Sequence, residues 1–169
     1  MLCSKDLLKS NTKIVTIAAS VLNSGTYGAY NYHGDSVRIH NPTHVEVSAK
    51  QAWEISGYGP EDMDVLQVYD TVSTSELWNL EYMGFCKKGE AARLLKEGVF
   101  DINGRLPVNT DGGLMSRGHV MGATAIAQII EVFKQLRGEA GPRQVSGAKI
   151  GLSQCLGAGP NSSITVLKR

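Results

Sequence analysis

The sequence contains few cysteines, and their spacing suits neither a disulfide framework nor a metal site. Cys3, Cys86 and Cys155 are an odd number of thiols, and no two of them form a Cys-x-x-Cys pair. This pattern argues against a disulfide-stabilised secreted fold and against a structural zinc site built by this chain alone. We therefore expect a protein of a reducing compartment that binds no metal.

The sequence also lacks a charge excess and a long apolar run. The formal net charge is +1, from 17 Lys+Arg and 16 Asp+Glu residues. A nucleic-acid-binding protein would need a concentrated basic face to meet the phosphate backbone. No apolar stretch approaches the ~20 residues of a membrane span, and Lys5 and Asp6 stand where a secretion signal would be apolar. We expect a soluble, cytoplasmic protein that binds neither nucleic acid nor membrane.

The chain is long enough for one hydrophobic core. It has 169 residues, of which 42% are hydrophobic and 20% are charged. This predicts a single domain over residues 1–169, with a long loop at 23–42. Short apolar, β-branched segments predict strands at 13–22, 64–69, 148–153 and 162–167. Apolar periodicity and capping signals predict helices at 43–55, 74–83, 89–97 and 123–136. Alternating strands and helices favour an α/β layered fold.

The predicted helix at 123–136 is unusual because apolar residues cover most of its circumference. A helix of this kind is stable only when it is enclosed on nearly every side. A domain of this size struggles to enclose a helix completely. The pattern therefore indicates that a second layer of protein covers it.

His119 and Cys155 are the two residues most suited to chemistry. His119 follows Gly118 just before the long helix, and Cys155 lies in a glycine-flanked run after a predicted strand. Glycine lets the backbone approach a ligand closely, and imidazole and thiol are proton-transfer groups. The alternatives are a turn histidine satisfied by backbone groups and a cysteine that acts as a small buried hydrophobe.

Polar residues also follow the second predicted strand. Tyr69 and Asp70 stand at its carboxyl end, where ligands commonly bind in α/β sheets. Tyr69 is a candidate to hold a water or a carbonyl oxygen, whereas Asp70 either orients a neighbour or caps the following helix. His33, His40 and His44 lie in or beside the long loop without clustered acidic or cysteine ligands, so we interpret them as solvated residues.

Several short motifs together resemble the thiolase superfamily. The motifs are Asn109-Thr110-Asp111-Gly112-Gly113, Gly118-His119, Gly122-Ala123-Thr124 and Cys155-Leu156-Gly157. They resemble the thiolase patterns N-x-x-GG, GH, GAT and C-x-G, in that order. The segment from Gln135 to Val145 is similar to the sterol-carrier-protein-type branch. Tyr69-Asp70-Thr71-Val72 stands where that branch carries HDCF and degradative thiolases carry NEAF. The resemblance extends from about residue 2 to the C-terminus.

The resemblance implies the fold of a C-terminal thiolase half. That fold is a mixed five-stranded sheet with helices on both faces, completed by an N-terminal half. The family's nucleophilic cysteine lies in the N-terminal half, to which no part of this sequence corresponds. We therefore expect the nucleophile to come from a partner chain.

The resemblance also implies roles for individual residues. His119 would activate the missing nucleophile, and Cys155 would be the acid/base at the carbon next to the thioester. Gly157, Tyr69 and Asp70 would position the substrate or its oxyanion, although Tyr69 replaces the family's histidine or asparagine. Two further residues, Asn109 and Gly118, would contribute to substrate binding.

The implied function is that of a split-thiolase subunit acting on a 3-oxoacyl-CoA. Coenzyme A would be a substrate, and no cofactor would be tightly bound. The implied partners are an N-terminal thiolase half, in a hetero-oligomer built around a thiolase-type dimer, and a zinc-ribbon/OB-fold protein that holds acyl-CoA. The alternatives are a thiolase-like aldolase acting on a sterol side-chain acyl-CoA, a non-catalytic scaffold, and a hydrolase using Cys155 as its nucleophile.

Overall fold

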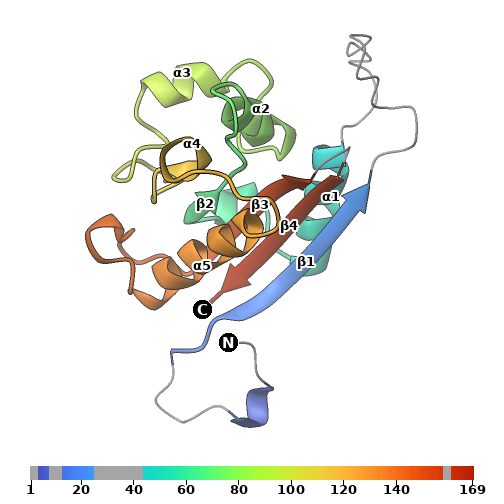
Figure 1. Ribbon diagram of the computed structural model, residues 1–169, viewed down its shortest axis with the longest axis vertical. Helices are drawn as coiled ribbons and strands as arrows, with labels where there is room; N and C mark the ends of the chain where they lie inside the picture. The colour runs from blue at the N-terminus through green and yellow to red at the C-terminus, as the bar shows by residue number, and fades with distance from the viewer. Residues whose placement is uncertain (1–3, 8–12, 25–43, 158–160) are drawn as a thin grey trace.

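A four-stranded mixed sheet with helices on both faces forms the centre of the molecule. The computed structural model describes residues 4–7, 13–24, 44–157 and 161–169. The strands are β1 (Thr16–Ser24), β2 (Val65–Gln67), β3 (Ile150–Gly157) and β4 (Asn161–Lys168), arranged in the order β1-β4-β3-β2. β4 pairs antiparallel with both β1 and β3, whereas β2 and β3 are parallel. Figure 1 shows β4 and β3 running through the middle of the molecule.

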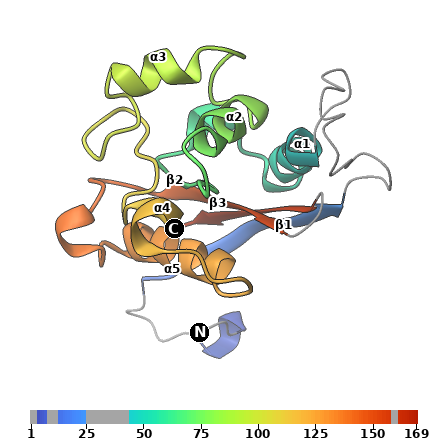
Figure 2. The same cartoon turned by 45° about the horizontal axis from the view of Figure 1, so that its top comes forward.

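Helices lie on both sides of this sheet. They are α1 (His44–Ser56), α2 (Ser75–Tyr82), α3 (Ala91–Lys96), α4 (Gly113–Arg117) and α5 (Thr124–Arg137), with short 3-10 turns at Lys5–Leu7, Pro60–Asp62 and Gly141–Arg143. Figure 2 shows α1 and α2 on one side of the sheet and α5 on the other. The predicted α/β class and the helices on both faces are therefore confirmed.

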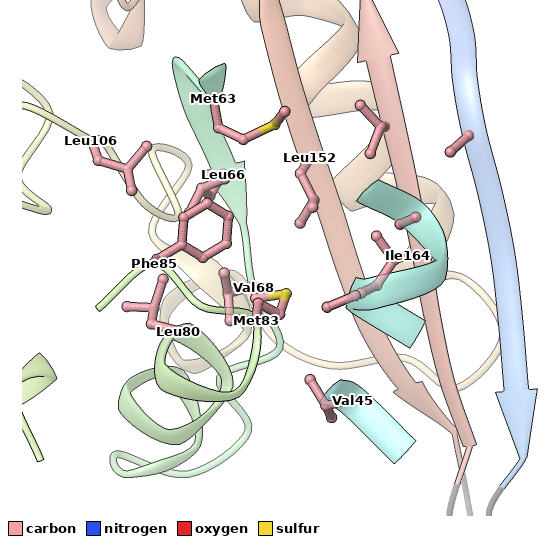
Figure 3. Packing of buried hydrophobic residues seen from close by; sticks show 14 of the residues in the cluster. Val45, Met63, Leu66, Val68, Leu80, Met83, Phe85, Leu106, Leu152 and Ile164 are labelled. Carbon is pink, nitrogen blue, oxygen red and sulfur yellow. The ribbon is translucent and has the colours of Figure 1, made fainter. Parts of the chain in front are cut away.

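The main core lies between the sheet and the α1–α2 side. Leu66 and Val68 from the β2 segment, Leu152 from β3 and Ile164 from β4 are fully buried there. Figure 3 shows them together with Leu80, Met83 and Phe85 from α2 and the segment after it. A smaller cluster on the opposite face joins Val65 and Leu167 of the sheet to Val132 and Leu136 of α5. The alternation of side chains along the strands supplies both faces of the sheet with apolar residues.

The expectation of a five-stranded sheet is wrong, because the described residues form four strands. The segment at Pro107–Asn109 runs beside β2, with Leu66 N donating to Pro107 O and Asn109 N donating to Leu66 O. It forms only one isolated parallel bridge, between Leu66 and Val108. Pro107 has no N–H to extend the pairing, and Asn109 has a left-handed backbone with φ 50°. These two residues limit the pairing to a single bridge.

Two further expectations change with the structure. Cys155 was expected in a turn after its strand, but it lies within β3, paired with Ser163 of β4. The antiparallel ladder continues through Gly157, so the thiol is held by a strand. The glycine-rich stretch before His119 also contains a short helix, α4, that the sequence did not predict. The loop tyrosines Tyr27, Tyr30 and Tyr32, and most of the predicted loop 23–42, lie outside the described residues.

Candidate functional site

The candidate site lies at the carboxyl end of β2 and β3, next to the start of α5. Tyr69 follows β2 directly, and Cys155 is near the end of β3. A Cβ on Gly151 would meet the Val132 side chain of α5, so alternate β3 residues from Gly151 to Cys155 face α5. The amide of Gln128, one turn into α5, donates to Gln154 O at 3.0 Å. His119 and Cys155 are therefore brought to the same end of the sheet.

Thr124, the first residue of α5, fixes the orientation of the His119 ring. Its hydroxyl lies 2.8 Å from His119 Nδ1, accepts from Val120 N at 3.1 Å and donates to Val120 O at 3.1 Å. The single hydroxyl proton goes either to Val120 O or to Nδ1, and when Val120 O accepts it, the contact with Nδ1 requires a proton on Nδ1. In that tautomer Nε2 carries no proton, which is the form a general base needs.

Tyr69 contacts the other nitrogen of the same ring. Its hydroxyl lies 3.3 Å from His119 Nε2, and the two rings meet edge-on with centroids 5.5 Å apart. In the tautomer with its proton on Nδ1, the phenol donates to Nε2. The backbone of Tyr69 is fixed on both sides, since its N–H donates to Gln154 Oε1 and its carbonyl accepts from Asn79 Nδ2. The structure thus joins Tyr69, His119 and Thr124 in one hydrogen-bonded row.

Asp70 is buried and caps α4 instead of the helix that follows it in sequence. Its Oδ1 accepts from Leu114 N at 2.7 Å, whereas Thr74 at the start of α2 makes no side-chain cap hydrogen bond. A Cβ on Gly113 would come within 2.1 Å of the Asp70 carboxylate. Gly113 is therefore needed for this contact. Asp70 holds α4, and with it the segment that carries His119.

Asn109 connects the strand end to α2. Its Oδ1 accepts from Val68 N at 2.8 Å, and its Nδ2 donates to Glu76 Oε2 at 2.6 Å. Burial raises the pKa of Glu76, with repulsion from Asp70 adding to the increase and the hydrogen bond from Asn109 opposing it. Both polar ends of Asn109 therefore contact protein groups in this structure. Its assignment to substrate binding stays a prediction.

Cys155 is half-buried, and its thiol is held in the protonated form. Burial raises its pKa, while a hydrogen bond with the Leu156 backbone and the positive charge of Arg117 oppose the increase. In its protonated form, Sγ lies 3.6 Å from Leu156 O and donates to it. A thiol with a raised pKa is a proton donor at neutral pH and a poor nucleophile. Nearby, Gly157 ends β3 as an exposed residue, and Gly118 ends α4 with φ 93°.

Thr124 and Arg117 are the residues whose roles sequence reasoning missed. Thr124 belongs to the Gly-Ala-Thr motif, but its contact with His119 depends on how the turn at 120–123 folds. Arg117 pairs with Asp111 at 2.8 Å, and only the fold brings it near Cys155. A hydroxyl at the first position of a helix, five residues after the histidine, was the only available signal.

The three histidines discussed above besides His119 do not form a metal site among the described residues. His33 and His40 lie outside the described residues, and His44 begins α1 with a pKa lowered by burial. No group of three or more His, Cys, Asp or Glu side chains comes together within residues 4–7, 13–24, 44–157 and 161–169. Within the same ranges, no helix is both long and apolar enough to span a bilayer.

Comparison with known proteins identifies the family. Residues 29–169 match the family described as Thiolase C-terminal domain-like, and the chain belongs to it. The chain is 38% identical to acetyl-CoA acetyltransferase of Methanothermobacter thermautotrophicus over 171 residues, which cover 100% of this chain and 44% of that protein. It is 44% identical to human sterol carrier protein 2 over 121 residues, covering 72% of this chain and 22% of that protein.

Two further similarities extend the comparison. The chain is 32% identical to benzoylsuccinyl-CoA thiolase subunit BbsB of Thauera aromatica over 162 residues, covering 94% of this chain and 41% of that protein. Among solved structures, the Ltp2-ChsH2(DUF35) aldolase superposes with a TM-score of 0.77 at 25% identity, over 91% of this chain and 39% of the matched chain. The chain thus spans less than half the length of each of these relatives.

Proposed function

We propose that this chain supplies the proton-transfer half of a split thiolase, which cleaves or forms a 3-oxoacyl-CoA together with a partner chain. The similarity to an acetyl-CoA acetyltransferase and to a thiolase subunit supports this reaction class. The observation that carries the proposal is the hydrogen-bonded row Tyr69–His119–Thr124, which holds an exposed histidine between a phenol at Nε2 and a hydroxyl at Nδ1.

The nucleophilic cysteine of the proposed reaction must come from outside the described residues. Burial, with Glu81 and Glu90 nearby, raises the pKa of Cys86 to about 11, which makes it unreactive at neutral pH. Cys155 is also held as a thiol, and Cys3 lies outside the described residues. These properties weaken the alternative of a hydrolase using Cys155 as its own nucleophile.

In the proposed cleavage reaction, His119 Nε2 takes the proton from the partner's cysteine, and the thiolate attacks the 3-oxo carbon. The bond between C2 and C3 then breaks, and its electron pair goes to C2. Cys155 donates its S–H proton to C2, which releases the shortened product thioester. Coenzyme A finally attacks the acyl group on the partner's cysteine. Covalent catalysis divides the carbon–carbon cleavage into two easier steps.

The surface of α5 supports the need for a partner. The side of α5 facing its own sheet buries polar residues, including Gln128, Glu131 and Gln135. In contrast, Ile126 and Ile130 on α5 are 57% and 46% exposed. Three more apolar residues around His119 are exposed as well, namely Met115, Val120 and Met121. An apolar surface beside the candidate base is what a second thiolase half would cover.

The proposal is tested by isolating the chain that co-purifies with this one and mixing the two. We expect CoA-dependent cleavage of acetoacetyl-CoA by the mixture only, with an acyl group trapped on a cysteine of the partner and seen by mass spectrometry. Replacing Cys155→Ala should lower turnover about 10²–10⁴-fold without affecting assembly. Cys86→Ala is the matched control and should retain activity. Equal turnover by both variants would exclude Cys155 from the mechanism, and an inactive wild-type complex would favour a scaffold.

Tyr69 and the similarity to an aldolase support a second candidate, retro-aldol cleavage of a 3-hydroxyacyl-CoA. In that reaction a base removes the 3-hydroxyl proton, the bond between C2 and C3 breaks, and C2 is reprotonated, so neither coenzyme A nor a nucleophilic cysteine is required. Cleavage of a 3-hydroxyacyl-CoA without added coenzyme A, abolished by Tyr69→Phe, would favour the aldolase. The aldolase structure is named for two components, and a second subunit such as an acyl-CoA-binding zinc-ribbon/OB-fold protein is part of either proposal.

A further inference from the structure

Arg117, the last residue of α4, lies on the same side of the sheet as Cys155 and is incompletely paired. Its Nε is 2.8 Å from Asp111 Oδ2, and its side chain is 22% exposed. The Nε–H is poorly aligned for a hydrogen bond with Asp111. Both Nε and Nη2 are buried without a hydrogen-bond acceptor among the described residues. Because an arginine presents five N–H donors, this guanidinium retains capacity for another anion.

Asp111 holds Arg117 in place from the sheet side. Its Oδ1 accepts from Gln67 Nε2 and from Gly113 N, both at 3.1 Å. Gln67 is paired in register with Ser153 on β3, so Gln67, Ser153 and Cys155 share the face that α5 covers. The Arg117–Asp111 pair is thus anchored to the strand next to the one that carries the thiol. The buried side-chain amide of Gln67, by holding Asp111, therefore fixes the positive charge of Arg117 relative to β3.

We propose that Arg117 is a positioning residue for Cys155, whose fixed positive charge stabilises the thiolate formed when Cys155 gives up a proton. This inference rests on the proposed acid/base role of Cys155. When the S–H bond breaks and the C–H bond forms at C2, the thiolate is left beside the guanidinium. The thiol of coenzyme A supplies the proton that regenerates S–H when it attacks the acyl group on the partner. No electrons are transferred to an acceptor in this cycle.

The other ionisable groups on this side already have partners. Glu131 of α5 pairs with Arg143 at 2.8 Å, Asp111 is the partner of Arg117, and the His119 ring is bonded to Thr124. Arg117 is the group whose charge opposes the effect of burial on the pKa of Cys155. The two guanidinium nitrogens without an acceptor therefore match, in position and in charge, a thiol that becomes an anion when it gives up its proton.

The test measures the reactivity of Cys155 in this chain alone, without a partner or substrate. Iodoacetamide alkylation of Cys155 is followed by peptide mass spectrometry between pH 6 and 10, with Cys86 in the same samples as an internal reference. In Arg117→Gln we expect alkylation of Cys155 at pH 8 to be about three- to tenfold slower, because the thiolate fraction falls. Arg117→Lys should retain most of the rate. Arg105→Gln, which removes an exposed arginine, is the matched control.

The outcomes separate this inference from the proposed function. A Cys155 profile in Arg117→Gln that matches Arg105→Gln overturns the inference, whatever the activity of the reconstituted complex. A slower Cys155 with an unchanged Cys86 supports it, because a general loosening of the fold would speed alkylation of both thiols. Should Arg117→Gln fail to fold by circular dichroism, Asp111→Asn replaces it. Removing that competing anion should speed alkylation of Cys155 about threefold, and no change would overturn the inference.

Discussion

The hydroxyl of Thr124 gives the most direct test of how this fold prepares His119. Thr124→Val keeps the shape of the side chain and removes the oxygen that contacts His119 Nδ1 at 2.8 Å and Val120 N at 3.1 Å. Val120 O keeps other donors, since it also accepts from the backbone N–H groups of Ala123 and Thr124. The substitution therefore leaves His119 Nδ1 and the Val120 N–H without the hydroxyl that each contacts.

The structure sets the size of the expected effects. The loss of two hydrogen bonds should cost about 1–2 kcal/mol of unfolding free energy. For a domain of this size, each kcal/mol lowers the melting temperature by about 2–4 °C. The larger effect should be on catalysis, because Nδ1 no longer has a partner that selects the form with a free Nε2. Removing the partner that orients a metal-bound histidine typically costs about 10–100-fold, and we expect an effect of about that size for His119.

Two measurements check this prediction. Turnover by the reconstituted complex should fall in Thr124→Val and remain close to wild type in Thr124→Ser, which keeps the hydroxyl. In the chain alone, ¹⁵N chemical shifts of the His119 ring should show a proton on Nδ1 in the wild type and a mixture of both neutral forms in the valine variant. Unchanged ring shifts together with full turnover would refute the reasoning.

Two other predictions follow from the charge and surface of α5. The double substitution Ile126→Glu and Ile130→Glu should change the unfolding free energy by no more than about 0.5 kcal/mol, because both side chains are exposed. It should also abolish co-elution with the partner in gel filtration, whereas Leu95→Glu on α3 should not. Burial alone would raise the pKa of Glu131, but its hydrogen bonds, of which the one from Arg143 is the strongest, lower the pKa below its usual value. The ionised Glu131 therefore stabilises the fold above pH 4.5, and this stabilisation is lost as the pH falls further. Arg143→Gln should therefore cost about 1–2 kcal/mol in urea unfolding at pH 7, and a cost that persists in strong acid would contradict this.

Much of the fold could be predicted because apolar periodicity reports burial directly. The four strands and the helices α1, α2, α3 and α5 all lie within a few residues of their predicted ranges. The fifth strand was wrong because it was inferred from family resemblance, and Pro107 and Asn109 prevent that segment from pairing further. The position of Cys155 was misjudged because glycines on both sides suggested a turn, whereas pairing with β4 extends the strand.

The sequence by itself determined which candidate reactive groups the chain carries, because imidazole and thiol chemistry depends on residue type and the motifs set their order along the chain. It also indicated that α5 would be covered by more than its own sheet. Only the tertiary structure decided that Thr124 and Tyr69 bond opposite nitrogens of His119, that Asp70 caps α4, and that Arg117 faces the side of the sheet carrying Cys155. Hydrogen bonds and charge interactions act over a few ångströms, and the residues concerned are brought that close only when the loops and strands have packed together.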